Sequence, residues 1–191
     1  VFELYNADAT KGNIINELIK IKGELTDHDN LIIYYAGHGD YNPANDEGAW
    51  VPVNANINSA DEYLNNQTLL NFLNDLDTKH TFLIADACFS GALFVSDEDM
   101  TYKPNNDKIK SRWGFTSGNI EYVADGQSGE GSPFANYLTE VLDENQQSYI
   151  AVTELISYVK FKVRNNALQT PIGRPLKLDG NEGGEFLLYT K

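Results

Sequence analysis

Apolar residues occur along this chain in two patterns: short continuous runs, and longer segments in which they recur every three or four positions. The runs at 31–35 and 81–85 are unbroken, which is typical of strands buried on both faces of a parallel sheet. Weaker runs predict further short extended segments, at 1–5, 50–53, 113–116 and 186–189. Helical spacing predicts helices over 14–19, 69–76, 133–142 and 152–163.

Polar residues and a proline indicate where two of these helices begin. Asp8 and Thr10 precede the first helical segment, and their side chains can cap its free N–H groups. Pro133 follows Ser132 and suits the first turn of a later helix, where no N–H is needed.

Strands that alternate with helices predict a single α/β domain over 1–191, with a mostly parallel central sheet flanked by helices. Ligand sites in such sheets lie at the carboxyl ends of the strands. His38 comes just after the first apolar run and Cys88 just after the second. We therefore expect both side chains at the same edge of the sheet.

Charge and cysteine content narrow the classes of function. Asp and Glu number 28 against 14 Lys and Arg, a net charge of -14 that repels polyanions, so we expect neither nucleic-acid nor membrane binding. The acidic surface favours basic protein or peptide partners, or simply keeps the domain soluble. One cysteine permits no disulfide within the chain, and no apolar run reaches the roughly 18 residues of a membrane span. Both observations fit a cytoplasmic protein.

Cys88 and His38 together can perform nucleophilic catalysis. A cysteine nucleophile needs a base to form its thiolate, and it needs N–H donors for the oxyanion that follows attack on a carbonyl. Small residues after Cys88 permit a tight turn into a helix whose N-terminus would favour thiolate. Gly39 lets the backbone approach a substrate closely, so we assign the Gly39 and Cys88 amides to the oxyanion hole. Taken singly, the cysteine could be a small buried apolar residue and the histidine a turn residue.

Two motifs carry a resemblance to a known family. The segment 34–39 reads Tyr-Tyr-Ala-Gly-His-Gly, the segment 86–91 reads Asp-Ala-Cys-Phe-Ser-Gly, and Cys88 follows His38 by 50 residues. This resembles the caspases, whose signature is Gln-Ala-Cys-x-Gly with a histidine about 50 residues upstream. Asp86 replaces the glutamine, as in the metacaspase, paracaspase and bacterial caspase-like branch. The resemblance extends through 47–52, 116–118 and 183–186.

The resemblance implies the three-layer caspase-hemoglobinase fold and a cysteine endopeptidase that acts on proteins or peptides. Its catalytic residues would be a dyad of Cys88 and His38 without a third, acidic member. No cofactor is implied, and one cysteine with three scattered histidines gives no metal-ligand spacing. Calcium activation, known in some metacaspases, stays open because carboxylates are so numerous. His28 and His80 lie outside both motifs, and we expect plain loop or strand-entry roles for them.

Asp86 predicts the cleavage specificity. Caspases proper cut after aspartate because arginines line the pocket for the residue before the scissile bond. A carboxylate two residues before the nucleophile would instead pair with arginine or lysine. Glu121 and Asp125 fall in a stretch that resembles the one completing this pocket in the family, and either could add a second acid. The alternative for these two is solvated loop charge.

The family layout divides the chain into a large-subunit-like part, 1–95, a polar linker, 96–112, and a small-subunit-like part, 113–191. Family members are often cut in such a linker. Four basic residues here could serve as sites of self-processing: Lys103, Lys108, Lys110 and Arg112.

One family strand has no counterpart in the chain. The segment 1–5 resembles the second, edge-side strand, so a central strand next to 31–35 is missing. Because an unpaired central strand would expose backbone groups, we expect an upstream segment that pairs between 1–5 and 31–35, in a longer protein. Regulatory domains could lie in that polypeptide or in a partner protein.

Two alternatives to a protease stay open. The first is a caspase-fold scaffold or regulatory module that has no catalytic activity, which the presence of both His38 and Cys88 disfavours. The second is another thiol chemistry on an α/β fold, such as that of an amidase or acyltransferase. A small-molecule pocket in place of an open peptide groove would favour the second alternative.

Overall fold

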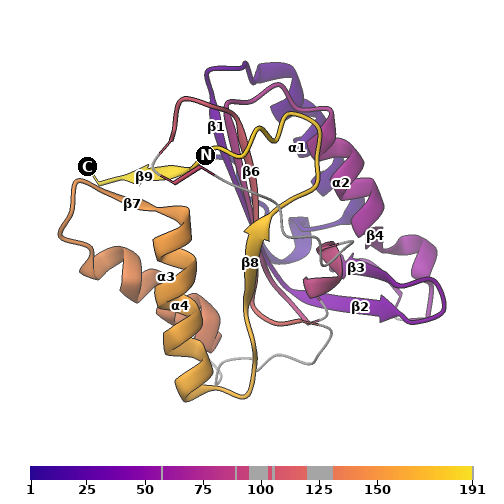
Figure 1. Cartoon of the computed structure of the whole chain (residues 1–191). Coiled ribbons are helices and arrows are strands. Elements are labelled where there is room, and N and C mark those ends of the chain that lie inside the picture. Colours follow the sequence, from indigo (N-terminus) through magenta and orange to yellow (C-terminus); the bar gives the residue numbers. More distant parts are fainter. Residues whose placement is uncertain (57, 89, 95–102, 105, 120–130, 191) are drawn as a thin grey trace.

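The computed structural model describes residues 1–191 except 57, 89, 95–102, 105, 120–130 and 191 (Figure 1). A central sheet is covered by helices on both faces. In chain order the elements are η1 (Asn6–Asp8), α1 (Lys11–Glu24), β1 (Asn30–Ala36), β2 (His38–Asn42), β3 (Glu47–Val51), η2 (Ala60–Glu62), β4 (Leu64–Asn65), α2 (Asn66–Asn74), β5 (His80–Asp86), η3 (Ser90–Leu93), β6 (Ser111–Thr116), α3 (Pro133–Glu144), β7 (Tyr149–Ala151), α4 (Val152–Asn166), β8 (Ile172–Pro175) and β9 (Leu187–Tyr189), where η denotes a 3-10 helix.

The central sheet has the strand order β1-β5-β6-β8. Strands β1, β5 and β6 are parallel, and β8 runs antiparallel to β6. The register pairs Ala36 of β1 with Asp86 of β5, so these two strands end side by side. The mostly parallel α/β sheet predicted from the apolar runs is confirmed.

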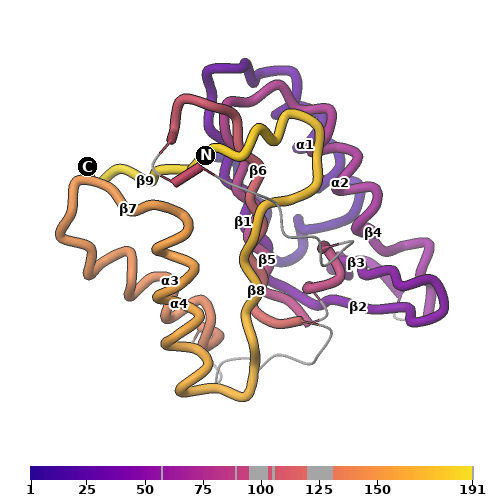
Figure 2. Tube along the Cα trace, in the orientation of Figure 1, coloured from indigo at the N-terminus to yellow at the C-terminus, as the bar shows by residue number. Residues whose placement is uncertain are grey.

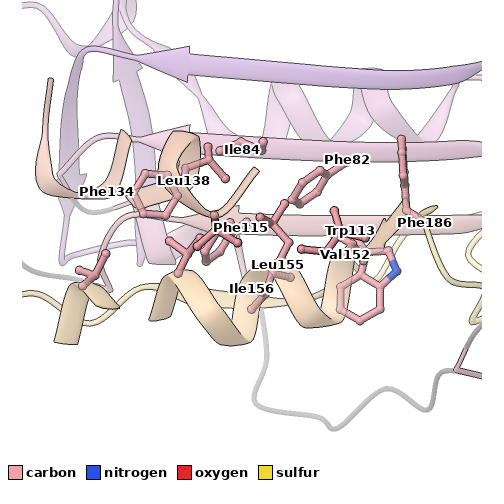
Figure 3. Close-up of a cluster of buried hydrophobic side chains, with 14 residues drawn as sticks. Phe82, Ile84, Trp113, Phe115, Phe134, Leu138, Val152, Leu155, Ile156 and Phe186 are labelled. Atoms are coloured by element: carbon pink, nitrogen blue, oxygen red, sulfur yellow. The ribbon is translucent and has the colours of Figure 1, made fainter. Parts of the chain in front are cut away.

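Each face of the sheet has its own apolar core. On one face, β5 and β6 pack against α3 and α4 through residues that include Phe82, Phe115 and Leu155 (Figure 3). On the other face, β1 and β5 pack against α1 and α2, with Leu83 and Leu73 fully buried between them. Figure 2 shows the same division along the Cα trace, with α1 and α2 on one side and α3 and α4 on the other.

Polar side chains fix the starts of three helices. The side chain of Thr10 accepts a hydrogen bond from the Asn13 N–H at the start of α1, as predicted. Asn65 does the same for α2, and Ser132 for α3. Pro133 occupies the first turn of α3, where its missing N–H costs nothing. No helix in the described part of the chain combines the length and apolar character that crossing a membrane requires.

Two sequence predictions about strands are wrong. Residues 1–5 form no strand, and the Phe2 ring lies 4.7 Å from the Lys20 ammonium on α1 instead of joining a sheet. Strand β1 is partly buried on one face and exposed on the other, where Ile32 and Tyr34 are 48% and 46% exposed. The prediction that the apolar run at 31–35 is buried on both faces of the sheet is therefore wrong.

The outer edge of β1 has no neighbouring strand among the described residues. Direct pairing of residues 1–5 with β1 would have contradicted the expected upstream strand, and this pairing does not occur. The upstream strand stays a prediction.

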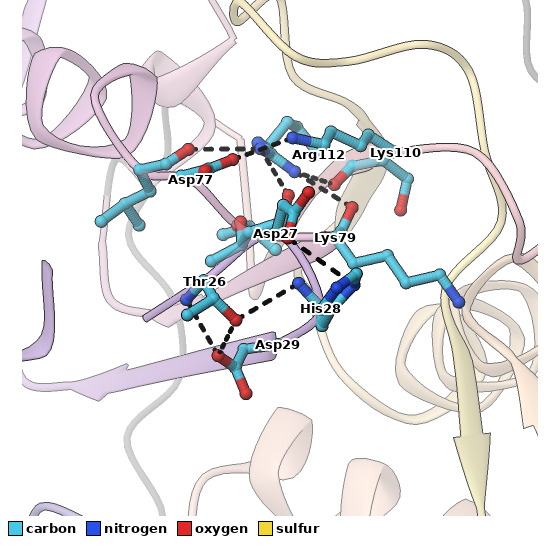
Figure 4. A network of polar contacts seen from close by, with 12 residues as sticks. Thr26, Asp27, His28, Asp29, Asp77, Lys79, Lys110 and Arg112 are labelled. Carbon is cyan, nitrogen blue, oxygen red and sulfur yellow. Dashed lines mark hydrogen bonds and ion pairs between the residues drawn. The ribbon is translucent and has the colours of Figure 1, made fainter. Parts of the chain in front are cut away.

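The predicted linker, 96–112, ends earlier than expected. Residues 111 and 112 begin β6, while 95–102 and 105 lie outside the described residues. Arg112 is 1% exposed and its guanidinium donates to four backbone carbonyls (Figure 4): Leu76, Thr78, Lys79 and Ser111. Burial lowers the pKa of this guanidinium. Arg112 was wrongly proposed as a cleavage site, because its backbone is inside a sheet and its side chain is enclosed.

Candidate active site

The carboxyl ends of β1 and β5 bring the two sequence motifs together. The Gly37 N–H donates to the carbonyl of Asp86 at 3.2 Å, one residue beyond the last register pair. His38 follows directly as the first residue of β2, and Cys88 lies two residues beyond β5. The two residues therefore lie at the same edge of the sheet, as expected from their positions after the apolar runs.

Gly39 lies close to the Cys88 backbone. A Cβ atom built at this position would lie 2.0 Å from the carbonyl oxygen of Cys88. Such a contact is impossible for any residue with a side chain, so the absence of a Cβ lets the two backbones meet. This contact places the Gly39 backbone, assigned from the sequence to an oxyanion hole, beside the Cys88 backbone.

The Tyr35 side chain fixes the position of the His38 backbone through a hydrogen bond. Its hydroxyl donates to the carbonyl of His38 at 2.8 Å and lies 3.4 Å from the carbonyl of Val51. The Tyr35 ring stacks on Trp50, with the ring centroids 4.1 Å apart and an interplanar angle of 3°. Burial raises the pKa of the Tyr35 phenol, which keeps it a neutral hydrogen-bond donor. The β2–β3 pairing, which puts His38 opposite Val51, completes this support.

The segment after β6 braces the turn that carries Cys88. The Ser117 N–H donates to the carbonyl of Ala85 at 3.0 Å, and the Ser117 hydroxyl donates to that of Ala87 at 3.4 Å. The side-chain amide of Gln169 in turn donates to the Ser117 carbonyl at 2.9 Å. Ser117 was noted in the sequence only as part of the family resemblance, and these contacts give it a structural role.

The helix expected directly after Cys88 is a 3-10 helix of four residues, Ser90–Leu93. The expectation of a helix dipole behind the thiolate was therefore wrong, since so short a helix aligns few peptide dipoles. Cys88 itself is partly exposed, as a nucleophile must be.

Asp86 is buried but lies next to an exposed side chain. It is 8% exposed, and its Oδ2 atom accepts a short hydrogen bond from the hydroxyl of Ser132, the cap of α3. The Tyr34 hydroxyl lies 3.5 Å from the same oxygen. Burial, and then the Asp86 charge, raise the pKa of Tyr34. The carboxylate thus lies on the sheet face that carries α3, beside a half-exposed ring.

Tyr34 and Ser132 were not identified from the sequence as members of the site. They lie 52 and 46 residues from Asp86 in the sequence, and a local sequence pattern cannot predict contacts between residues so far apart in the chain. One signal was available for Tyr34, because it lies two positions before Ala36 and so shares the Asp86 side of the sheet. Glu121 and Asp125, the other predicted pocket residues, lie outside the described residues.

The other histidines lie away from this edge. His80 begins β5, at the opposite end of the strand from Asp86, and is buried. Its Nδ1 atom lies 2.7 Å from the Ser111 hydroxyl and its Nε2 atom lies 2.9 Å from the Asp107 carbonyl. His28 is exposed in the turn before β1. The strand-entry role predicted for His80 is confirmed.

Comparisons with known proteins agree with this architecture. A family model described as the caspase domain of peptidase C14 matches residues 2–177. A search of curated proteins found no match. The crystal structure of a protein from Geobacter sulfurreducens superposes with a TM-score of 0.65 at 16% sequence identity, and the match covers 92% of this chain and 76% of the other. At that identity the likeness concerns the fold alone.

Proposed function

Since the chain belongs to the caspase family, which supports a cysteine protease at the level of the family, we propose that it is an endopeptidase with Cys88 as nucleophile and His38 as general base. The observation that carries the proposal is the contact between the Gly39 backbone and the Cys88 carbonyl. It joins the histidine segment to the cysteine turn at the strand ends, where ligands bind in parallel sheets.

The proposed reaction proceeds in two stages. His38 takes the thiol proton, and the sulfur of Cys88 attacks the carbonyl carbon of the scissile bond to give a tetrahedral oxyanion. The Gly39 and Cys88 N–H groups stabilise that oxyanion. When the C–N bond breaks, the leaving amine takes the proton from His38, which leaves a thioester. Water then attacks the thioester as His38 accepts one of its protons, and returning that proton to sulfur releases the acid and restores the enzyme.

We further propose cleavage after arginine or lysine. The Asp86 carboxylate lies at the carboxyl end of β5, two residues before the nucleophile, and Tyr34 next to it is open to solvent. The hydroxyl of Ser132 donates a hydrogen bond to the carboxylate and fixes its position. A guanidinium or ammonium group entering past Tyr34 would find a fixed negative charge. Glu121 and Asp125 stay candidates for a second acid in this pocket.

A panel of fluorogenic peptides tests both proposals. We expect measurable cleavage after arginine and lysine and little after aspartate, because Asp86 would repel an acidic side chain. Cys88→Ala should reduce hydrolysis to background, since no other thiol is available. Asp86→Asn should lower kcat/KM for arginine peptides by about a hundredfold, because it removes a charged partner of the substrate.

The outcomes separate the alternatives. Faster cleavage after aspartate than after arginine contradicts the specificity but keeps the peptidase. Equal rates in wild type and Cys88→Ala contradict the nucleophile. A folded wild type that is silent on every peptide contradicts the peptidase proposal itself.

A further inference from the structure

Helix α4 has an apolar inner face and an unusual outer face. The inner face packs on the sheet through Val152, Leu155 and Ile156 (Figure 3), together with Val159 and Val163. We define the α4 outer face as Tyr158, Lys160, Phe161 and Arg164. Tyr158, Phe161 and Arg164 are exposed, and Lys160 is partly buried at the border with the inner face. The two aromatic side chains of this face are 57% and 69% exposed. Two exposed rings three residues apart form a contiguous apolar surface on one helix.

The two cations of the outer face have the same sign and are neighbours. Lys160 and Arg164 are four residues apart, a spacing at which like charges destabilise a helix. Burial lowers the pKa of Lys160, and the Arg164 charge lowers it further. Among the described residues, neither cation forms an ion pair with a carboxylate. Within the part of the chain that the structure describes, these two positive charges therefore lie together without an acidic partner.

The other charged residues of α4 in the same region, Glu154 and Lys162, have described partners. Lys162 is neutralised by two carboxylates of α3, Glu140 at 2.9 Å and Glu144 at 3.1 Å. Glu154 is the one acid of α4, and its carboxylate accepts from the Ala151 N–H at the start of the helix. These three described carboxylates are thus engaged by other groups, and Lys160 and Arg164 give the outer face two positive charges in a molecule whose net charge is -14.

We propose that the α4 outer face binds an acidic segment of a protein partner that also carries apolar side chains. Aromatic rings and arginine are the side chains that most often dominate the energy of protein interfaces, and acidic groups complement the positive charges of Lys160 and Arg164. The net charge of -14 opposes polyanions and anionic membranes. It also opposes a second copy of the chain, which would bring an equal negative charge. A short acidic peptide or helix carries fewer negative charges than these, so the net charge of the molecule repels it less.

The length of the surface suits such a partner. Helix α4 contains 15 residues, so it is about 22 Å long, and a partner helix of similar length could lie along it. The proposal is independent of the catalytic proposal, because no residue of the outer face belongs to the candidate active site.

A binding experiment with a defined probe tests the inference. The probe is a fluorescein-labelled helical peptide with glutamate and leucine on one face, and its counterpart has lysine in place of every glutamate. Fluorescence polarisation should show saturable binding of the acidic probe only, weakening as sodium chloride is raised. Lys160→Glu with Arg164→Glu should weaken binding about tenfold, because two attractions become repulsions. Tyr158→Ala with Phe161→Ala should weaken it to a similar extent, in a way that salt does not alter.

Matched controls use exposed residues elsewhere. Lys108→Glu and Tyr5→Ala change one surface cation and one surface ring far from α4 in the sequence, and they should leave binding unchanged. Thermal melts confirm that each variant folds. If the double variant Lys160→Glu with Arg164→Glu does not fold, Lys160→Gln with Arg164→Gln, which only removes the charges, takes its place. Equal binding of the two probes, or equal binding by wild type and the outer-face variants, overturns the proposal. A concentration-dependent doubling of mass that the outer-face variants abolish also overturns it, since a second copy is then the occupant.

Discussion

At the scale of single residues, hydrogen bonds to backbone carbonyls do much of the positioning near the site. Tyr35 donates to His38, and Ser117 donates to Ala87, one residue before the cysteine. Neither side chain needs to contact a substrate to affect the proposed reaction, because each holds the backbone at or next to a proposed catalytic residue. Such residues are positioning residues, and their loss should alter rates more than substrate binding.

Tyr35→Phe tests this view of the His38 support. The substitution keeps the stack on Trp50 but leaves the His38 carbonyl without its donor. We expect kcat to fall about tenfold with KM little changed, since one hydrogen bond contributes about 1 kcal/mol. The rate of Cys88 alkylation by iodoacetamide, followed against pH, should change as well if His38 is displaced. Tyr41→Phe removes a hydroxyl that bonds Asp46 at the hairpin tip and serves as the control. Equal kcat values for wild type and Tyr35→Phe would refute the assignment.

At the scale of elements, the hairpin of β2 and β3 contacts the turn after β5 that carries Cys88. The contact depends on Gly39, and it joins the antiparallel sheet β2-β3-β4 to the carboxyl edge of the central sheet. The hairpin therefore belongs to the candidate site, and it also packs against α2 through Trp50 of β3.

Gly39→Ala should separate these two elements. The new methyl group would lie 2.0 Å from the Cys88 carbonyl oxygen, so either the hairpin or the cysteine turn must move. We expect peptidase activity to fall about a hundredfold, the loss typical of a reacting group misplaced by about 1 Å. Gly12→Ala is the matched control, because a Cβ there has no atom within 4 Å. Circular dichroism should show both variants folded, and an active Gly39→Ala enzyme would mean that the close approach is not required.

The sequence predicted elements well wherever a local pattern decides the structure. The unbroken apolar runs located β1 and β5, and helical spacing located the four α-helices. Predictions failed where the deciding partner is distant in the chain. Residues 1–5 have a strand-like composition but pair with no strand among the described residues, and Arg112 looked like a linker charge although carbonyls at 76–79 enclose it. Tyr34 and Ser132 meet Asp86 only after the sheet and α3 have formed.

At the scale of the whole molecule, the amino ends of β5 and β6 bring together residues from before, within and after the predicted linker. His80 binds Ser111 and the Asp107 carbonyl, and it packs on Phe186 near the end of the chain, with the ring centroids 5.5 Å apart. With Nε2 as the donor to Asp107 and Nδ1 as the acceptor from Ser111, both contacts suit a neutral imidazole. Burial lowers the pKa of His80 from its usual value of 6.5.

This lowered pKa makes the stability depend on pH. In the unfolded chain His80 takes up a proton near pH 6.5, whereas in the folded protein it resists protonation. The unfolded state therefore binds more protons, so the contribution of His80 to stability is full above pH 6.5 and declines as pH falls below it. Urea midpoints between pH 8 and pH 5 should fall more steeply in wild type than in His80→Gln, which keeps a donor toward Asp107. His28→Gln, at an exposed site, should keep the wild-type slope, and identical slopes in wild type and His80→Gln would contradict the prediction.

The enclosed guanidinium of Arg112 has a consequence for any processed form. Six residues of β5 pair with β6, and Arg112 on β6 donates hydrogen bonds to the backbone just before β5. The two products of a cut after Lys103 would therefore stay joined by a shared sheet, a shared core and these hydrogen bonds. Nicking would leave one particle of unchanged hydrodynamic size, and only a denaturing gel would reveal two polypeptides. A switch based on such a cut could free the loop ends without releasing either fragment.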